Sequence, residues 1–132
     1  MKKFFLLIIF ASCLLLTGCG NKSFILMKSE PFTAQNAQYT EQTFSQGERI
    51  YFAVVNPSGF KDDAVKIEII EKNEKTGSMG YSIKYAKDRQ IENSEKYFTD
   101  YFVLRSSGFF IMQVFELRRP DKCLARCYFR VK

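Results

Sequence analysis

Few side chains of this sequence could carry chemistry, and their types exclude several mechanisms. The chain has no histidine, and its four cysteines are Cys13, Cys19, Cys123 and Cys127. Without histidine, neither a Ser-His-Asp triad nor a Cys-His pair can form, and the histidine-containing zinc motifs are excluded. The sequence also lacks a phosphate-binding glycine loop and EF-hand spacing. It therefore predicts no enzyme, no catalytic residue, no metal site and no cofactor, which leaves the cysteines to explain.

The best-defined pattern leads up to Cys19. The chain opens with Met-Lys-Lys, residues 4–16 are apolar except for Ser12, and two small residues ending at Gly18 precede the cysteine. This layout is typical of a secretory signal peptide. A helix of this apolar run would rise about 20 Å, which is too short for the roughly 30 Å hydrocarbon core of a bilayer. We therefore expect residues 1–18 to be a cleaved signal peptide and not a transmembrane helix.

The end of this pattern, Leu16-Thr17-Gly18-Cys19, resembles the lipobox of bacterial lipoproteins. The resemblance implies that a diacylglyceryl thioether forms on Cys19 and that signal peptidase II cuts after Gly18. The protein would then be lipid-anchored to the cell membrane or outer membrane, facing the periplasm or the cell exterior. Two or three acyl chains make release slow, since each buried CH₂ contributes about 0.8 kcal/mol. The alternative is a secreted protein in which Cys19 is an ordinary thiol.

Cys123 and Cys127 would both remain in the mature chain, in a compartment that permits disulfides. In one straight strand their Cα atoms would be about 13 Å apart, whereas a disulfide needs less than about 7 Å. Either both thiols are free and Cys127 packs inward, or a turn or bulge near Leu124 brings them together. We favour free thiols. Arg126 would lie on the opposite face of the strand from Cys127, so core packing explains that thiol better than nucleophilic chemistry does.

Carboxylate pairs occur at three places, namely Asp62-Asp63, Glu68 with Glu71, and Glu92 with Glu95. Glycosidase chemistry needs two carboxyl groups about 5–10 Å apart across a cleft, and nothing in these spacings predicts that they converge. Asp62 and Asp63 follow shortly after Gly59, so we expect them to lie in a solvated turn.

The net charge of the chain is modest once the signal peptide is removed. Residues 1–18 contain two of the 20 basic residues and none of the 14 acidic ones, so the mature chain carries +4. A nucleic-acid partner is not expected, because no basic helix is present and the compartment is extracytoplasmic. We expect a solvated surface, although one set of basic residues could form a flank near anionic headgroups: Lys84, Lys87, Arg89, Arg118, Arg119, Lys122, Arg126 and Arg130.

Runs of β-branched and aromatic residues alternate with turn residues through most of the chain. We expect strands at residues 49–56, 64–72, 79–87, 96–105 and 109–117, and a last strand that ends at residue 131. Turns are expected at residues 56–59, 73–78, 106–108 and 120–122. Alternation places three sets of residues each on one side of its strand: Val65, Ile67 and Ile69; Tyr81, Ile83 and Tyr85; and Ala125, Cys127, Phe129 and Val131.

These elements predict an all-β chain with a single antiparallel β-sandwich at residues 43–132, and a closed barrel is the alternative. Residues 19–42 would be the lipidated N-terminus and tether. Their apolar patch at residues 24–27 is either a first edge strand, ended by Pro31, or a segment near the lipid surface.

The segment Gly108-Phe109-Phe110-Ile111-Met112-Gln113-Val114, with the later strand ending Phe129-Arg130-Val131, resembles the last hairpin of immunoglobulin-like and fibronectin-type-III-like domains of bacterial surface proteins. In that pattern an aromatic residue follows two positions after a turn glycine and alternate residues enter the core. Phe110, Met112 and Val114 would play this part. The chain has no tryptophan, so the resemblance implies a looser sandwich than an antibody domain.

Aromatic residues are numerous, with 14 phenylalanines and seven tyrosines. The phenylalanines that we assign to the core are Phe52, Phe98, Phe102, Phe110 and Phe129. The tyrosines that alternate with them and should face outward are Tyr51, Tyr97, Tyr101 and Tyr128. Exposed tyrosines can stack on sugar rings or anchor a protein interface. Tyr51, Tyr97 and Tyr101 are therefore the candidate binding surface.

The sequence as a whole predicts a membrane-anchored cell-envelope lipoprotein that acts as a non-enzymatic protein-interaction or structural module, with an envelope protein as its partner. One alternative is a carbohydrate-binding module for peptidoglycan or a surface glycan. Another is a loop-based enzyme or peptidase inhibitor that uses residues 56–64 or 73–79. The oligomeric state is not indicated.

Overall fold

The computed structural model describes residues 22–72, 81–92 and 95–132. Within these ranges the regular elements are strands, and no helix is long and apolar enough to cross a membrane. The strands are β1 (Phe24–Lys28), β2 (Thr43–Phe44), β3 (Arg49–Val55), β4 (Ala64–Lys72), β5 (Tyr81–Gln90), β6 (Tyr97–Val103), β7 (Gly108–Glu116) and β8 (Arg119–Val131). The expected signal peptide, the lipidation site at Cys19, the cleavage site at Gly18 and the turn at residues 73–78 lie outside the described residues.

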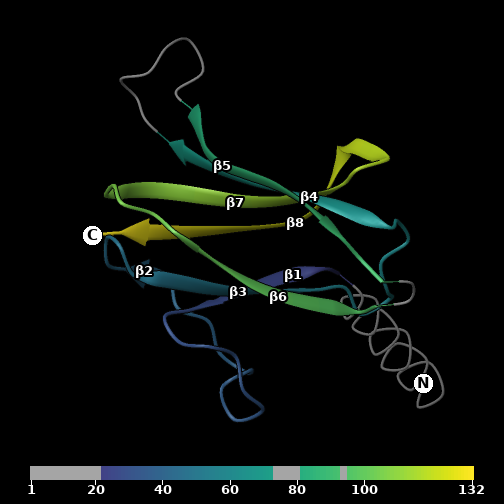
Figure 1. The fold of residues 1–132 in the computed structure, drawn as a ribbon, viewed down its shortest axis with the longest axis horizontal. Helices are drawn as coiled ribbons and strands as arrows, with labels where there is room; N and C mark the ends of the chain where they lie inside the picture. Colours follow the sequence, from purple (N-terminus) through teal and green to yellow (C-terminus); the bar gives the residue numbers. More distant parts are fainter. Residues whose placement is uncertain (1–21, 73–80, 93–94) are drawn as a thin grey trace, which may run out of the picture.

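The strands form two sheets that stack face to face (Figure 1). The smaller sheet has the order β1-β3-β6, and the larger has the order β2-β8-β7-β4-β5. β2 runs parallel to β8, and the other pairings are antiparallel. The prediction of an all-β sandwich is confirmed, and the apolar patch at residues 24–27 belongs to β1, an edge strand of the smaller sheet.

The core lies between the sheets and follows the alternation of the strands. Val65, Ile67 and Ile69 of β4 are fully buried, as are Met112 and Val114 of β7. The five phenylalanines assigned to the core are also buried, and their rings contact one another across the interior: Phe52, Phe98, Phe102, Phe110 and Phe129. Each buried phenylalanine contributes about 1.5–3 kcal/mol, so this cluster supplies a substantial part of the hydrophobic stabilisation of the domain.

One predicted alternation is wrong, in β5. The register pairs Ile69 with Tyr85 and Ile70 with Ile83, so Lys84 is an extra residue at a β-bulge. Because the side-chain period of a strand is two, the extra residue moves Ile83 to the outer face while Tyr85 packs against the core. The side chain of Tyr81 lies outside the described part.

The turn between β7 and β8 also differs from the prediction. The sequence predicts a turn at residues 120–122, whereas the chain turns at Leu117 and Arg118, and Pro120 already lies in β8. The register there pairs Glu116 with Arg119 and shifts before Phe115 meets Cys123. Proline fits this irregular stretch because no regular ladder hydrogen bond is required from its nitrogen.

The sandwich has two ends, which bear on where a site can be (Figure 1). We call the end that contains residues 22–24, 56–63 and 117–118 the proximal end. There Phe24 pairs with Val55. The opposite, distal end contains residues 45–48 and 104–107 and the C-terminus. There Gly108 pairs with Val131.

Candidate functional site

The three tyrosines predicted as a binding surface lie on the outer face of the smaller sheet, but they do not form one group. The rings of Tyr51 and Tyr101 are 5.7 Å apart and inclined by 49°, and the Arg49 guanidinium lies 4.9 Å from the Tyr101 ring. Tyr97 is four residues away along β6 at the proximal end, or about 13 Å. The structure therefore brings Tyr51 and Tyr101 together and leaves Tyr97 separate.

The same outer face is partly covered by the chain itself. Lys28 lies in register with Tyr51 and is fully buried, with its Nζ 3.3 Å from the ring centre of Tyr39 and 5.6 Å from that of Phe32. Among the described residues, this ammonium group has no hydrogen-bond partner. The segment 29–42 thus closes over the lysine through cation–π contacts, which reduces the surface that this sheet can offer to a ligand.

This covering segment is held to β1 by hydrogen bonds. The Glu41 N–H donates to the Met27 carbonyl at 2.7 Å, and the Met27 N–H donates to the Thr40 hydroxyl at 2.9 Å. The chain then crosses to the larger sheet, where the Arg130 N–H donates to the Gln42 carbonyl at 2.8 Å. Residues 40–42 therefore join the edges of both sheets.

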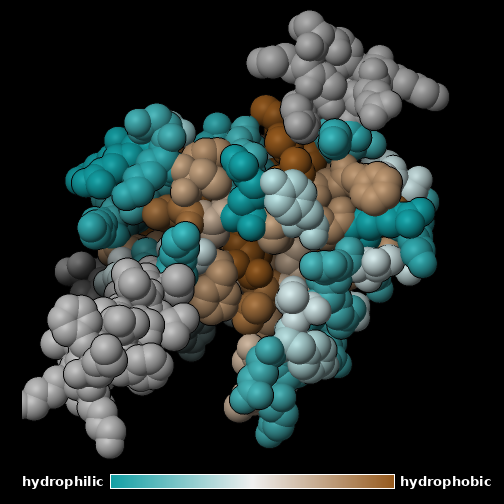
Figure 2. Space-filling model, turned by 180° about the vertical axis from the view of Figure 1, so that it is seen from behind, coloured by the Kyte–Doolittle hydropathy of each residue, from teal (hydrophilic) through white to brown (hydrophobic). Residues whose placement is uncertain are grey.

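The outer face of the larger sheet is different, because an apolar row runs across four of its strands. In register, these residues are Tyr128, Ile111, Ile70 and Ile83. Phe109 lies in the next row, where the Arg130 guanidinium is 5.2 Å from its ring. We call these residues, with Arg126, the aromatic face. Seen from behind, hydrophobic side chains lie in the centre of the molecule and reach its upper part, with hydrophilic side chains on both sides (Figure 2).

Three large members of the aromatic face are open to solvent: Phe109, Ile83 and Tyr128 are 61%, 62% and 63% exposed. Sequence reasoning placed Tyr128 outward but missed the other two. The signal for Phe109 was present, since it alternates with the core residue Phe110. The signal for Ile83 was not, because the bulge at Lys84 reverses its side.

A groove of 1350 Å³ runs over this face towards the distal end. Ile70, Phe109, Ile111 and Tyr128 line it, and its charged side chains include Arg126, Arg130, Lys72 and Glu71. Glu71 is already paired with Lys84 at 3.1 Å, so the net character of the groove is aromatic with a cationic rim. Aromatic residues and arginine are the types that protein interfaces favour.

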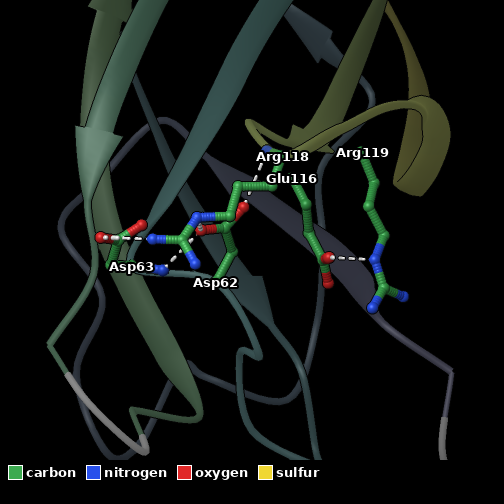
Figure 3. Close-up of polar contacts among 5 residues, drawn as sticks. All are labelled: Asp62, Asp63, Glu116, Arg118 and Arg119. Carbon is green, nitrogen blue, oxygen red and sulfur yellow. Dashed lines mark hydrogen bonds and ion pairs between the residues drawn. The ribbon is translucent and has the colours of Figure 1, made fainter.

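The first carboxylate pair, Asp62 and Asp63, belongs to a polar cluster at the proximal end (Figure 3). Asp62 is buried and accepts hydrogen bonds from the Arg118 and Asp63 N–H groups, both at 2.8 Å. The Arg118 N–H is the main reason that the pKa of Asp62 is lowered. The expectation of a solvated turn is therefore wrong for Asp62, which ties the β3–β4 loop to the β7–β8 turn, whereas the Asp63 side chain is exposed. Beside them, buried Glu116 lies 3.9 Å from Arg119.

The two cysteines of the described chain are free, as favoured from the sequence. Leu124 is left out of the register between Ala125 and Cys123, so a bulge does occur there, but it does not join the thiols. The Cys127 Sγ lies 3.4 Å from the Met27 Sδ, between the two sheets. Burial raises the pKa of Cys127 to about 12, which leaves it protonated and unsuited to nucleophilic attack.

Most of the possible basic flank is engaged in ion pairs. Lys87 and Arg89 both contact Asp100, at 3.1 and 3.3 Å. Burial alone would raise the pKa of Asp100, but the Tyr101 N–H and these cations outweigh it and the pKa is lowered. In residues 22–72, 81–92 and 95–132, no three cysteine, histidine or acidic side chains gather in a way that could hold a metal ion.

Comparisons with known proteins support the fold. No family model and no curated protein matches the chain. Among solved structures, it is similar to the PmoD soluble domain from Methylocystis sp., with a TM-score of 0.53, 16% identity, and coverage of 83% of this chain and 90% of that one. It is also similar to an immunoglobulin-like protein from Pseudomonas aeruginosa, with a TM-score of 0.50, 11% identity, and coverage of 82% and 96%. At these identities the likeness shows the fold alone, an immunoglobulin-like β-sandwich.

Proposed function

We propose that this protein is a membrane-anchored cell-envelope lipoprotein whose sandwich is a non-enzymatic interaction module, and that another envelope protein binds its aromatic face. The observation that carries the proposal is the exposure of Phe109 and Tyr128, which line one groove, and of Ile83, which lies in register with the groove residue Ile70. Contiguous apolar patches on soluble domains commonly mark interaction sites. The expected anchor at Cys19 would present this face in the envelope.

The shape of the groove favours a protein over a small molecule. Small-molecule sites are concave and enclose most of the ligand, whereas this groove lies open across a sheet. Its central row is apolar, and its rim carries Arg126 and Arg130. Such an apolar centre with a polar rim is the usual anatomy of a protein interface.

The titrating groups support a non-enzymatic role. Asp62 holds a turn, Asp100 holds two cations and Cys127 is half-buried against the core beside Met27. The pKa of each carboxyl is lowered and that of the thiol is raised. Each shift moves its group away from neutral pH, whereas a general acid or base works best with a pKa near the operating pH.

Site-specific photo-crosslinking in the native cells tests the proposed interface. Tyr128 and, separately, Tyr97 are replaced by p-benzoylphenylalanine in the full chain. Both tyrosines are similarly exposed, at 63% and 62%, but they lie on different sheets. We expect one defined crosslinked adduct from position 128 and none from position 97. The adduct from position 128 should disappear when Phe109→Ser is added to the same chain. Equal adducts from both positions, or none from position 128, would contradict the proposal.

The anchor has its own test. Cells fed an alkyne-labelled fatty acid should incorporate it into the wild-type chain and not into Cys19→Ser, which should leave the membrane fraction. Label retained in Cys19→Ser would disprove lipidation at this residue, whatever the result of the crosslinking.

A carbohydrate-binding role is the second candidate, and the paired rings of Tyr51 and Tyr101 favour it. If glycan binds there, retention on purified cell wall should fall for Tyr101→Ala and stay unchanged for Tyr97→Ala. The inhibitor hypothesis has less support. In its loop at residues 56–64, Phe60 and Asp62 are buried, and its other loop, residues 73–79, lies outside the described residues.

A further inference from the structure

A second groove, of 560 Å³, lies at the proximal end of the sandwich. The start of the described chain, the β3–β4 loop and the β7–β8 hairpin line it together. They contribute three exposed lysines, Lys22, Lys61 and Lys122, together with Arg126, which also borders the aromatic face. Its one acidic side chain, Glu116, is buried and lies beside Arg119. We call this the basic groove, and hydrophilic side chains gather around that hairpin at the upper left of Figure 2.

The basic groove is close to the expected lipid. Cys19 precedes Lys22 by three residues, with only Gly20 and Asn21 between them. Three Cα–Cα steps span at most about 11 Å. Electrostatic attraction acts over about 8–10 Å at physiological ionic strength. If Cys19 is lipidated, as the proposed function requires, Lys22 lies within about one screening length of the headgroups, and the groove that Lys22 lines is brought to the bilayer surface.

The chemistry of the groove matches phosphate oxygens. Lysine ammonium and arginine guanidinium groups donate charge-assisted hydrogen bonds to phosphate, and basic residues beside a membrane anchor are attracted to anionic lipids. We infer that the basic groove binds the phosphates of anionic phospholipid headgroups. This contact fixes the orientation of the domain: the proximal end rests on the bilayer, and the distal end of the aromatic face points away from it.

Lysine footprinting of the lipidated full-length protein tests this inference. The protein is reconstituted into vesicles of phosphatidylcholine alone, or with 30 mol% phosphatidylglycerol, and treated with an acetylating reagent. Mass spectrometry then gives the modification rate of each lysine. Lys61 and Lys122 are the reporters, and Lys132 at the distal end is the matched control. We expect about fivefold slower acetylation of both reporters in the anionic vesicles, and no change at Lys132. In 1 M salt the protection should vanish.

Three further outcomes are decisive. Equal rates in both vesicle types would overturn the basic groove as a lipid site. Protection by 10 mM inorganic phosphate on neutral vesicles, equal to that by phosphatidylglycerol, would assign the groove to free phosphate and overturn the headgroup. Flotation of the protein with neutral vesicles reports the anchor separately, because loss of flotation rejects the proposed function, whereas flotation without protection rejects only the groove.

Discussion

The outer faces of the two sheets carry similar residues, tyrosines and phenylalanines beside cations, but they differ in what lies over them. On the smaller sheet, Lys28 is enclosed by Tyr39 and Phe32. On the larger sheet, Phe109 and Tyr128 remain open beside Arg130. The difference shows that an outward-facing aromatic residue becomes a candidate site only where the chain does not return to cover it. The contrast can be tested by removing the open residues or the cover.

The largest effect is expected from the open face. The double substitution Phe109→Ser and Tyr128→Ser should weaken binding of the crosslinked partner by about 30-fold or more, because truncating the central aromatic residues of such an interface costs at least about 2 kcal/mol in total. Titration of the purified partner gives the dissociation constant. The matched pair Tyr51→Ser and Tyr101→Ser on the smaller sheet should change it less than threefold. A greater loss from that pair would reverse the comparison.

The second-largest effect is expected from loosening the segment 29–42, which covers Lys28. Tyr39→Ala removes the ring closest to the Lys28 ammonium and should lower the free energy of unfolding by about 1–2 kcal/mol, the range for a desolvated cation–π contact. Urea denaturation measures the change. Compared with the wild type, amide hydrogen exchange in the variant should be faster in segment 29–42 and unchanged in β7. Unchanged stability and exchange would show that the segment does not depend on this contact.

A smaller change of opposite sign is expected from the lysine itself. Lys28→Met keeps most of the buried volume and removes an ammonium group that has no hydrogen-bond partner among the described residues. Removing such a group avoids the cost of burying its charge but also removes the cation–π contact. The net effect should be a rise in the free energy of unfolding of up to about 1 kcal/mol. Lys66→Met, at a more exposed lysine, is the control. Strong destabilisation by Lys28→Met would mean that the charge is essential to the cover.

Acid should loosen the larger sheet through Asp62. Its pKa is lowered in the folded state, so its stabilising contribution is present above the unfolded pKa of about 4 and is lost as pH falls through the folded value. Below pH 4, we expect the urea midpoint of the wild type to fall modestly. The fall should be smaller in Asp62→Asn, whereas in Asp63→Asn it should equal that of the wild type. Equal acid sensitivity in wild type and Asp62→Asn would exclude this carboxylate as the cause.

The sequence predicted those parts of the fold that depend on local alternation. The faces of β4 and the inward residues Phe110 and Phe129 follow from a period of two, which neighbouring residues reveal. The bulge at Lys84 depends on pairing with β4, so no local pattern indicated it. The burial of Asp62 depends on Arg118, which is 56 residues away along the chain. In the candidate site, local alternation places Tyr128 and Phe109 outward, although only Tyr128 was predicted, whereas the outward side of Ile83 depends on the bulge at Lys84.

The sulfur contact between Cys127 and Met27 affects how this thiol would respond to oxidants. Disulfide exchange and oxidation to sulfenic acid begin from the thiolate. A thiol whose pKa is about 12 is almost wholly protonated near neutral pH. Once β1 has docked against β8, Cys127 should therefore react more slowly with oxidants and disulfides than an exposed thiol does. If the chain is exported as proposed, this cysteine is most reactive before that docking.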